Sequence, residues 1–153
     1  MPDRLTLSDI ACWVVKTRIQ PFDILAGWSP GTARDLTRCL RRSYRIELMR
    51  PGQRCVLWQS GSVAPGVRAI GRLTSEATVG ETDDAAGRDA EVAVALYLLE
   101  QPVSRAALLA DPVFSAAEVL RMPAGSNPSY RTPSGLDSLT EHISPRDRDR
   151  AGW

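Results

Sequence analysis

Two strand-like runs that stand close together most strongly limit what this chain can fold into. The runs CVLWQS (55–60) and VRAIGRLT (67–74) are rich in Val, Leu, Ile and Trp, and the loop between them carries Gly61, Pro65 and Gly66. A short, turn-rich connection of this kind joins antiparallel strands in a hairpin. Two further strand-like runs lie at 11–17 (ACWVVKT) and 91–99 (EVAVALYLL). With helices in the remaining segments, the sequence predicts an α+β fold with a curved, mostly antiparallel, barrel-like sheet flanked by helices.

Most helices are expected in the second half of the chain. Ser104, Ser115 and Thr132 each stand where a helix N-cap is expected, before helices predicted at 105–111, 116–122 and 133–143. Glu118 follows Ser115 by three residues, which is the spacing of a capping box. A single helical turn is predicted within FDILAG, residues 22–27.

A longer helix is predicted from Ser29-Pro30 to the turn MRPGQR at 49–54. Its leucines would face inward, and five arginines would fall within about 100° of the opposite face: Arg34, Arg38, Arg41, Arg42 and Arg45. Residues 34–54 hold seven arginines against two acids, a local charge of +5, whereas residues 76–91 carry −5. Such a stripe is either a solvated face or a phosphate contact surface. Its one-sided charge favours phosphates, and nucleic-acid binding is then expected to weaken steeply with salt.

Length and composition favour one domain, predicted at 1–143, with a charged tail or linker at 144–153. The chain has 153 residues, of which 43% are hydrophobic. It has no apolar run near the roughly 20 residues that span a membrane, and its start lacks the pattern of a signal peptide. We therefore expect a bacterial cytoplasmic protein that can associate with the nucleoid. Cys12, Cys39 and Cys55 are too widely spaced for a zinc cluster or disulfide framework and are expected to be buried thiols.

The sequence shows no set of residues with catalytic spacing. The single histidine, His142, stands near the end of the last predicted helix, where a cation is favourable for structural reasons. The stretch WQSGS lacks the G-x-S-x-G turn that exposes a nucleophilic serine. Metal-ligand clusters and Gly-rich phosphate loops are absent from the sequence, so we expect no cofactor and no metal. A small hydrolase or nuclease is therefore the minor alternative.

Tryptophans are better candidates for ligand recognition. Trp28 stands between Gly27 and Ser29, at the expected junction of a loop and a helix. It could stack on a nucleic-acid base, which contributes about 1–3 kcal/mol per base, or it could close the core over the helix start. Residue type alone does not separate the two interpretations. Trp13 and Trp58 lie on predicted strands, where core packing is favoured, and Trp153 lies in the predicted tail.

The order of several blocks resembles the EVE domain of the PUA-like superfamily, which is similar to the YTH readers of methylated adenine. These blocks are CWVVKT, GWSPGTARDLTRCLRR, RCVLWQSGSVAPGVRAIGRL, EVAVALYLLEQPVSRAALL and RMPAGSNPSYRTPSGLDSL, and together they cover about 12–140. The resemblance implies a barrel-like sheet and a pocket that accepts a modified base. By matching position, Trp28 would be one aromatic wall of this pocket and Ser60 would contact the base edge. Trp13, Lys16, Trp58, Gln59 and Asn127 would line the pocket or its rim.

The resemblance implies a non-catalytic module that flips a modified base, most simply a modified cytosine in DNA, into this pocket. A partner nuclease or other effector would fit, since EVE domains occur in modification-dependent restriction systems. Extracting a base costs a few kcal/mol, which stacking and hydrogen bonds to the base edge must offset. A methyl group discriminates by only about 1–3 kcal/mol, so selectivity requires a close fit and a hydrogen bond. The alternative is a PUA-like module that binds structured or modified RNA.

Overall fold

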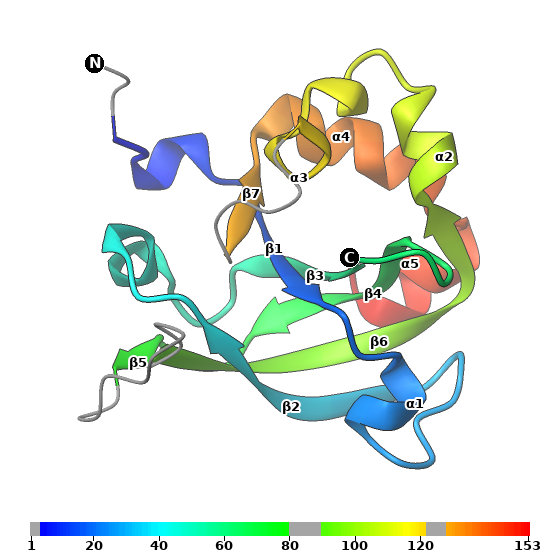
Figure 1. Ribbon diagram of the computed structural model, residues 1–153, viewed down its shortest axis with the longest axis horizontal. Coiled ribbons are helices and arrows are strands. Elements are labelled where there is room, and N and C mark those ends of the chain that lie inside the picture. The colour runs from blue at the N-terminus through cyan, green and yellow to red at the C-terminus, as the bar shows by residue number, and fades with distance from the viewer. Residues whose placement is uncertain (1–3, 80–89, 122–127) are drawn as a thin grey trace.

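The protein forms one curved sheet with helices packed on its outer side (Figure 1). The computed structural model describes residues 4–79, 90–121 and 128–153. Within these ranges the strands are β1 (Cys12–Thr17), β2 (Ala33–Leu40), β3 (Arg54–Gln59), β4 (Gly66–Leu73), β5 (Thr78–Val79), β6 (Ala90–Ser104) and β7 (Ser129–Arg131). The order is β2-β6-β4-β3-β1-β7, with β5 paired to β6. The pair β1–β3 is parallel and the other pairs are antiparallel, so the predicted fold class is confirmed.

The helices of the described residues are short and gather mainly after β6. They are α1 (Pro21–Ile24), α2 (Arg105–Leu109), α3 (Glu118–Arg121), α4 (Pro133–His142) and α5 (Pro145–Ala151), with 3-10 helices η1 (Leu7–Asp9), η2 (Tyr44–Leu48) and η3 (Phe114–Ala116). The predicted caps at Ser104 and Thr132 are confirmed, because their side chains accept from the N–H groups of Ala107 and Gly135. The prediction of a capping box at Ser115 is wrong, because Ser115 lies inside η3. No helix in the described part of the chain is long and apolar enough to cross a membrane.

Side-chain alternation along the strands builds two cores. The outer face of the sheet, represented by Val14, Val56 and Tyr97, packs against Leu108 of α2 and Leu139 of α4. The inner face takes residues from β1, β2, β3, β4 and β6, so these strands curve around a common interior. The core therefore fixes the faces of β1 and β3 on which the candidate site residues lie.

The segment predicted as an arginine-striped helix is instead the edge strand β2, followed by η2. Leu36 and Leu40 are four residues apart, and this spacing places them on one face in either a helix or a strand. Pairing with β6 decides the outcome, because all eight residues of β2 find partners there. In the strand, Arg34 and Arg38 lie on the same face as the leucines rather than opposite to them.

The segment predicted as a solvated tail contains helix α5, which packs on β6. Asp147 is fully buried, and its carboxylate accepts from Tyr97 Oη at 2.8 Å and from the N–H groups of Glu100 and Gln101 at 3.2 and 3.1 Å. Trp153 Nε1 donates to the Gly71 carbonyl of β4 at 3.1 Å. The structure thus differs from the expectation of a separate tail, since these contacts attach residues 145–153 to the sheet.

Candidate nucleic-acid interface

The parallel strands β1 and β3 end side by side and bring together four of the predicted base-binding residues. Lys16 is the register partner of Trp58, and Thr17 is the partner of Gln59. The Ser60 N–H donates to the Thr17 carbonyl at 2.8 Å, which extends the pairing one residue past the strand. Because the two strands are far apart in sequence, only this long-range pairing brings Lys16, Trp58, Gln59 and Ser60 to one end of the sheet. The side chains of Lys16 and Trp58 lie there on the outer face, and that of Gln59 lies on the inner face.

A β-bulge shapes the same end of the sheet. The register between β3 and β4 shifts after Leu57, so Arg68 has no partner residue between Val67 and Ala69. The bulge turns the Arg68 guanidinium to the Gln20 side chain, which accepts a hydrogen bond at 2.8 Å. Bulges of this kind re-aim side chains at functional ends of sheets.

Gln59 is the most unusual of the four clustered residues. Its side chain is 0% exposed, and its Oε1 has no hydrogen-bond partner among the described residues. The Nε2 atom donates to the Ser60 carbonyl at 3.4 Å, which is a long contact. An unpaired buried acceptor costs about 1–3 kcal/mol. The Gln59 carboxamide therefore holds a covered acceptor at the strand end that no described residue uses, and a base reaches it only when the groups that cover it move.

Trp58 lies on the opposite face from Gln59, in the outer core. Its ring stacks on Phe114 with centroids 6.4 Å apart and an interplanar angle of 14°. The side chain is 3% exposed. This placement agrees with the core-packing interpretation of Trp58.

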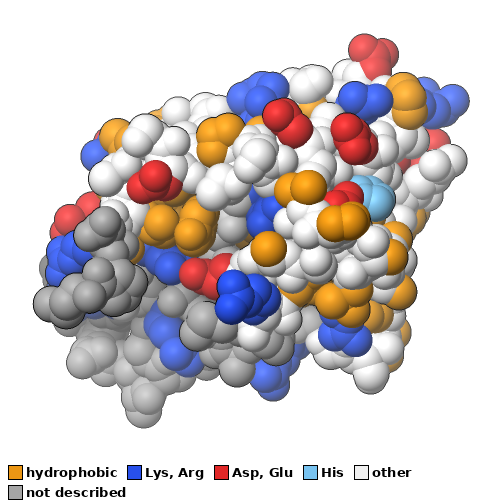
Figure 2. Space-filling model, turned by 90° about the horizontal axis from the view of Figure 1, so that it is seen from above, with side chains coloured by type: hydrophobic (Ala, Val, Ile, Leu, Met, Phe, Trp, Pro, Cys, Tyr) orange, Lys and Arg blue, Asp and Glu red, His pale blue; other side chains and the backbone are white. Residues whose placement is uncertain are grey.

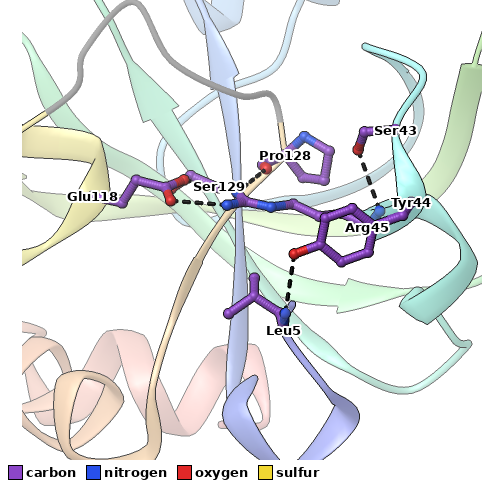
Figure 3. A network of polar contacts seen from close by, with 7 residues as sticks. All are labelled: Leu5, Ser43, Tyr44, Arg45, Glu118, Pro128 and Ser129. Carbon is purple, nitrogen blue, oxygen red and sulfur yellow. Dashed lines mark hydrogen bonds and ion pairs between the residues drawn. The ribbon is translucent and has the colours of Figure 1, made fainter. Parts of the chain in front are cut away.

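An ion-paired network ties η2, α3 and β7 together (Figure 3), and its charges act on Lys16. The Arg45 guanidinium donates to both Glu118 carboxylate oxygens, at 2.7 and 2.9 Å, and to the Pro128 carbonyl at 3.2 Å. Ser129 Oγ donates to Glu118 at 2.9 Å. The hydrogen bond with Arg45 lowers the pKa of Glu118 and raises that of Arg45, so the pair stays charged.

Lys16 is partly buried, and several charged side chains act on its ammonium group. Burial lowers the pKa of the Lys16 ammonium, and the nearby Glu118 carboxylate opposes that shift. Arg41 and Arg45 add positive potential to the same place. Three cationic side chains around one paired carboxylate leave a net positive charge at the end of β1.

The tryptophans that were candidate pocket walls lie in the inner core. Trp28 is 2% exposed, and its Nε1 donates to the Thr32 carbonyl at 3.0 Å. Trp13 is 0% exposed, and its Nε1 donates to Gln53 Oε1 at 2.8 Å. A ring covered to this extent has no face free for stacking on a base, which agrees with the core interpretation of both residues.

The predicted phosphate contacts do not form one stripe. Arg34 and Arg38 lie on the inner face of β2, Arg41 and Arg42 are exposed after that strand, and Arg45 is held by Glu118. A hollow of about 450 Å³ lies between η2 and β5 and includes Arg42 in its wall. Asn127, the remaining candidate, lies outside the described residues.

The remaining polar candidates have structural surroundings. His142 Nε2 lies 2.7 Å from Asp111 Oδ2, which links the end of α4 to the segment after α2. Figure 2 shows the histidine, in pale blue, on the surface beside a group of hydrophobic side chains. Cys12 and Cys55 are buried, and burial raises the pKa of the Cys12 thiol to about 12. Cys39 is exposed on the edge strand, so the prediction of three buried thiols is wrong for this residue.

Sequence reasoning missed the residues that surround the clustered candidates. Glu118 was assigned to a helix cap, and Gln20, Arg68 and Ser129 were not singled out. Each acts through a partner distant in sequence, such as Arg45 for Glu118 and Gln20 for Arg68. The described residues contain no group of three or more His, Cys, Asp or Glu side chains arranged to hold a metal ion.

The curved sheet, the bulged β3–β4 hairpin and the helical layer are similar in fold to an EVE/PUA-like domain, as the sequence resemblance implies. Similar solved structures include a Pseudomonas syringae protein with a TM-score of 0.64 and 12% identity, covering 86% of this chain and 98% of that one. A Rhodopseudomonas palustris protein has a TM-score of 0.58 and 19% identity, covering 94% of each chain. Human THYN1, solved in complex with DNA containing 5-methylcytosine, has a TM-score of 0.54 and 12% identity, covering 88% and 99%. Neither a family model nor a curated protein matches the sequence.

Proposed function

We propose that this protein is a non-catalytic nucleic-acid-binding module that reads a modified base, preferentially a modified cytosine in DNA, at the shared end of β1 and β3. The observation that carries the proposal is the buried Gln59 carboxamide, whose Oε1 lacks a partner among the described residues. Cytosine carries an exocyclic amino group, and such a donor complements a carbonyl acceptor. The proposal is also supported by the fold, which is shared with a protein that was solved with methylated DNA.

The charges around the strand end suit an extruded nucleotide. Lys16, with Arg41 near it, carries positive charge at the same strand end, on the outer face opposite to Gln59, where it can attract a phosphate. Ser60 is half-buried next to Gln59 and offers a hydroxyl that both donates and accepts. In this arrangement the half-buried Ser60 meets the base edge first, and Gln59, which is 0% exposed, accepts from the base once the groups that cover it move.

The first test measures base preference. The protein is titrated at fixed salt with two otherwise identical DNA duplexes, one with plain cytosine and one with 5-methylcytosine, and with a structured RNA. We expect at least about tenfold tighter binding to the modified duplex, which corresponds to about 1.4 kcal/mol. Equal binding to both duplexes would overturn modified-cytosine reading. Preference for the RNA, independent of modification, would favour the RNA-binding alternative.

The second test uses Gln59→Leu. Because this change removes an unpaired buried oxygen, we expect an unchanged or higher melting temperature, together with weaker binding to both duplexes, since cytosine and 5-methylcytosine carry the same amino group. A residue with a purely structural role would give the opposite result, with lower stability and intact DNA affinity.

Gln53→Leu is the matched control. The Gln53 carboxamide accepts from Trp13 Nε1 and donates to the Leu48 carbonyl, so its hydrogen bonds are satisfied. This control should lower the melting temperature and leave the affinity of the folded protein for both duplexes unchanged. If both variants behave alike, Gln59 has no specific role in reading the base.

A further inference from the structure

Two loops beside the candidate site expose large hydrophobic side chains. Phe22 of α1 and Val63 of the β3–β4 loop are each 65% exposed, and Ile19 is 50% exposed. These three belong to a set of seven exposed large hydrophobic residues in the described part of the chain. The other four lie elsewhere, in η1, in β5 and around α2. Hydrophobic surface that gathers in this way marks a contact site more often than scattered single residues do.

Gln20 holds the two loops together. Its Nε2 donates to the Val63 carbonyl at 3.1 Å, and its Oε1 accepts from Arg68 at 2.8 Å. Arg68 is the bulged residue of β4, so the hydrogen bonds of Gln20 attach both loops to the sheet. Ala64 next to Val63 has a φ of 47°, which is the left-handed region that non-glycine residues rarely adopt. Hydrogen bonds therefore hold in place the two loops that carry the exposed side chains.

Both loops begin at the end of the sheet where the candidate site lies. The β3–β4 loop begins at Ser60, directly after Gln59, and the α1 loop begins directly after Thr17, the partner of Gln59. Two arginines adjoin these loops next to the exposed side chains, since Arg18 precedes Ile19 and the Arg68 guanidinium contacts Gln20. The acids are Asp23 within the α1 loop and Glu100, whose carboxylate lies against Gly31 at its far end. Exposed hydrophobic side chains with two arginines beside them suit DNA, a polyanion with apolar base faces, better than an apolar groove of a protein.

We infer that Phe22, Val63 and Ile19 form an apolar wedge that enters the base stack of a DNA duplex at the position left by the extruded base. Phe22 is the leading side chain, and Gln20 holds the α1 loop to the β3–β4 loop, which begins directly after Gln59. Apolar wedges offset part of the cost of unstacking, which is a few kcal/mol per step. This inference rests on the proposed function, because only a protein that extrudes a base leaves a gap to fill.

The test compares duplex and single-stranded DNA. Phe22→Ala is titrated with a duplex carrying one 5-methylcytosine and with the same modified strand alone. We expect about tenfold weaker binding to the duplex, and single-strand binding within about twofold of wild type, because a single strand needs no wedge. The base next to the modified position is replaced by 2-aminopurine, whose fluorescence rises on unstacking and should rise less with the variant.

Leu7→Ala is the matched control, since Leu7 is 51% exposed and lies in η1, away from both loops. It should bind both DNAs as wild type does, and all three proteins should melt at similar temperatures. The inference is overturned if Phe22→Ala leaves duplex binding intact, as a protein-docking patch would, or weakens duplex and single-strand binding equally. Failure of the proposed function would look different, because the wild type itself would then bind modified and plain DNA equally.

Discussion

Replacing Trp28 with alanine separates a core role from a ligand-binding role. The ring is 2% exposed in the inner core, with Trp13, Leu40 and Met49 in the same cluster. Truncation of a buried aromatic side chain costs about 3–5 kcal/mol, mainly through the cavity that it leaves. The lost indole hydrogen bond adds little, because the Thr32 carbonyl also accepts from the Leu98 N–H at 3.0 Å. For a domain of this size, we expect the melting temperature to fall by about 6–20 °C.

The assay for Trp28→Ala combines urea denaturation with DNA titration well below the melting temperature. Affinity of the folded protein for modified DNA should stay within about twofold of wild type, because a covered ring offers no stacking face. Trp28→Phe refills most of the cavity and should recover more than half of the lost stability. The core assignment would be refuted by a variant that is as stable as wild type and binds modified DNA at least about tenfold more weakly.

Two further predictions concern charged groups that join distant segments. Glu118→Gln should lower the free energy of unfolding by about 1–3 kcal/mol at pH 7, because Arg45 loses its charged partner. Since the folded-state pKa of Glu118 is lowered, its contribution is present above the ordinary carboxyl pKa of about 4.3 and is lost as the pH falls through the folded-state pKa. Denaturation at pH 7 and at pH below about 4 should therefore show a difference between wild type and variant that shrinks in acid, and a difference independent of pH would contradict the ion-pair explanation. Asp147→Asn should lower the free energy of unfolding by about 1–3 kcal/mol. The carboxylate accepts three hydrogen bonds, and the amide would turn its own N–H donor toward at least one of those three donors. Hydrogen exchange should show faster opening of α5 in this variant, and unchanged exchange there would mean that Asp147 does not hold the helix.

Local signals predicted much of the fold. The strand-like runs appear as β1, β3, β4 and β6, because dense β-branched and aromatic residues favour pleated, half-buried strands. The caps at Ser104 and Thr132 are short-range hydrogen bonds, so the sequence around each cap determines them. The helix predicted over β2 failed because a four-residue leucine spacing suits both structures, and pairing with β6 outweighed the local pattern.

The candidate site was predicted as residue types but not as an arrangement. The sequence marked Gln59 and Ser60 at the end of a strand, next to a turn-rich loop. It did not show that Gln59 would be buried with an unused oxygen, because burial depends on what packs over the strand from elsewhere in the chain. The sequence around Trp28 is compatible with base stacking and with core packing, and only the burial of the ring distinguishes these two roles.

The sequence alone determined that this chain builds a mixed, mostly antiparallel sheet with capped helices, because strand propensity and capping act over a few residues. The tertiary structure decided what long-range pairing controls. Parallel pairing of β1 with β3 brought Lys16 and Gln59 to one end of the sheet. Burial of Asp147 made a charged terminal segment part of the domain, since the three donors that its carboxylate needs lie on β6.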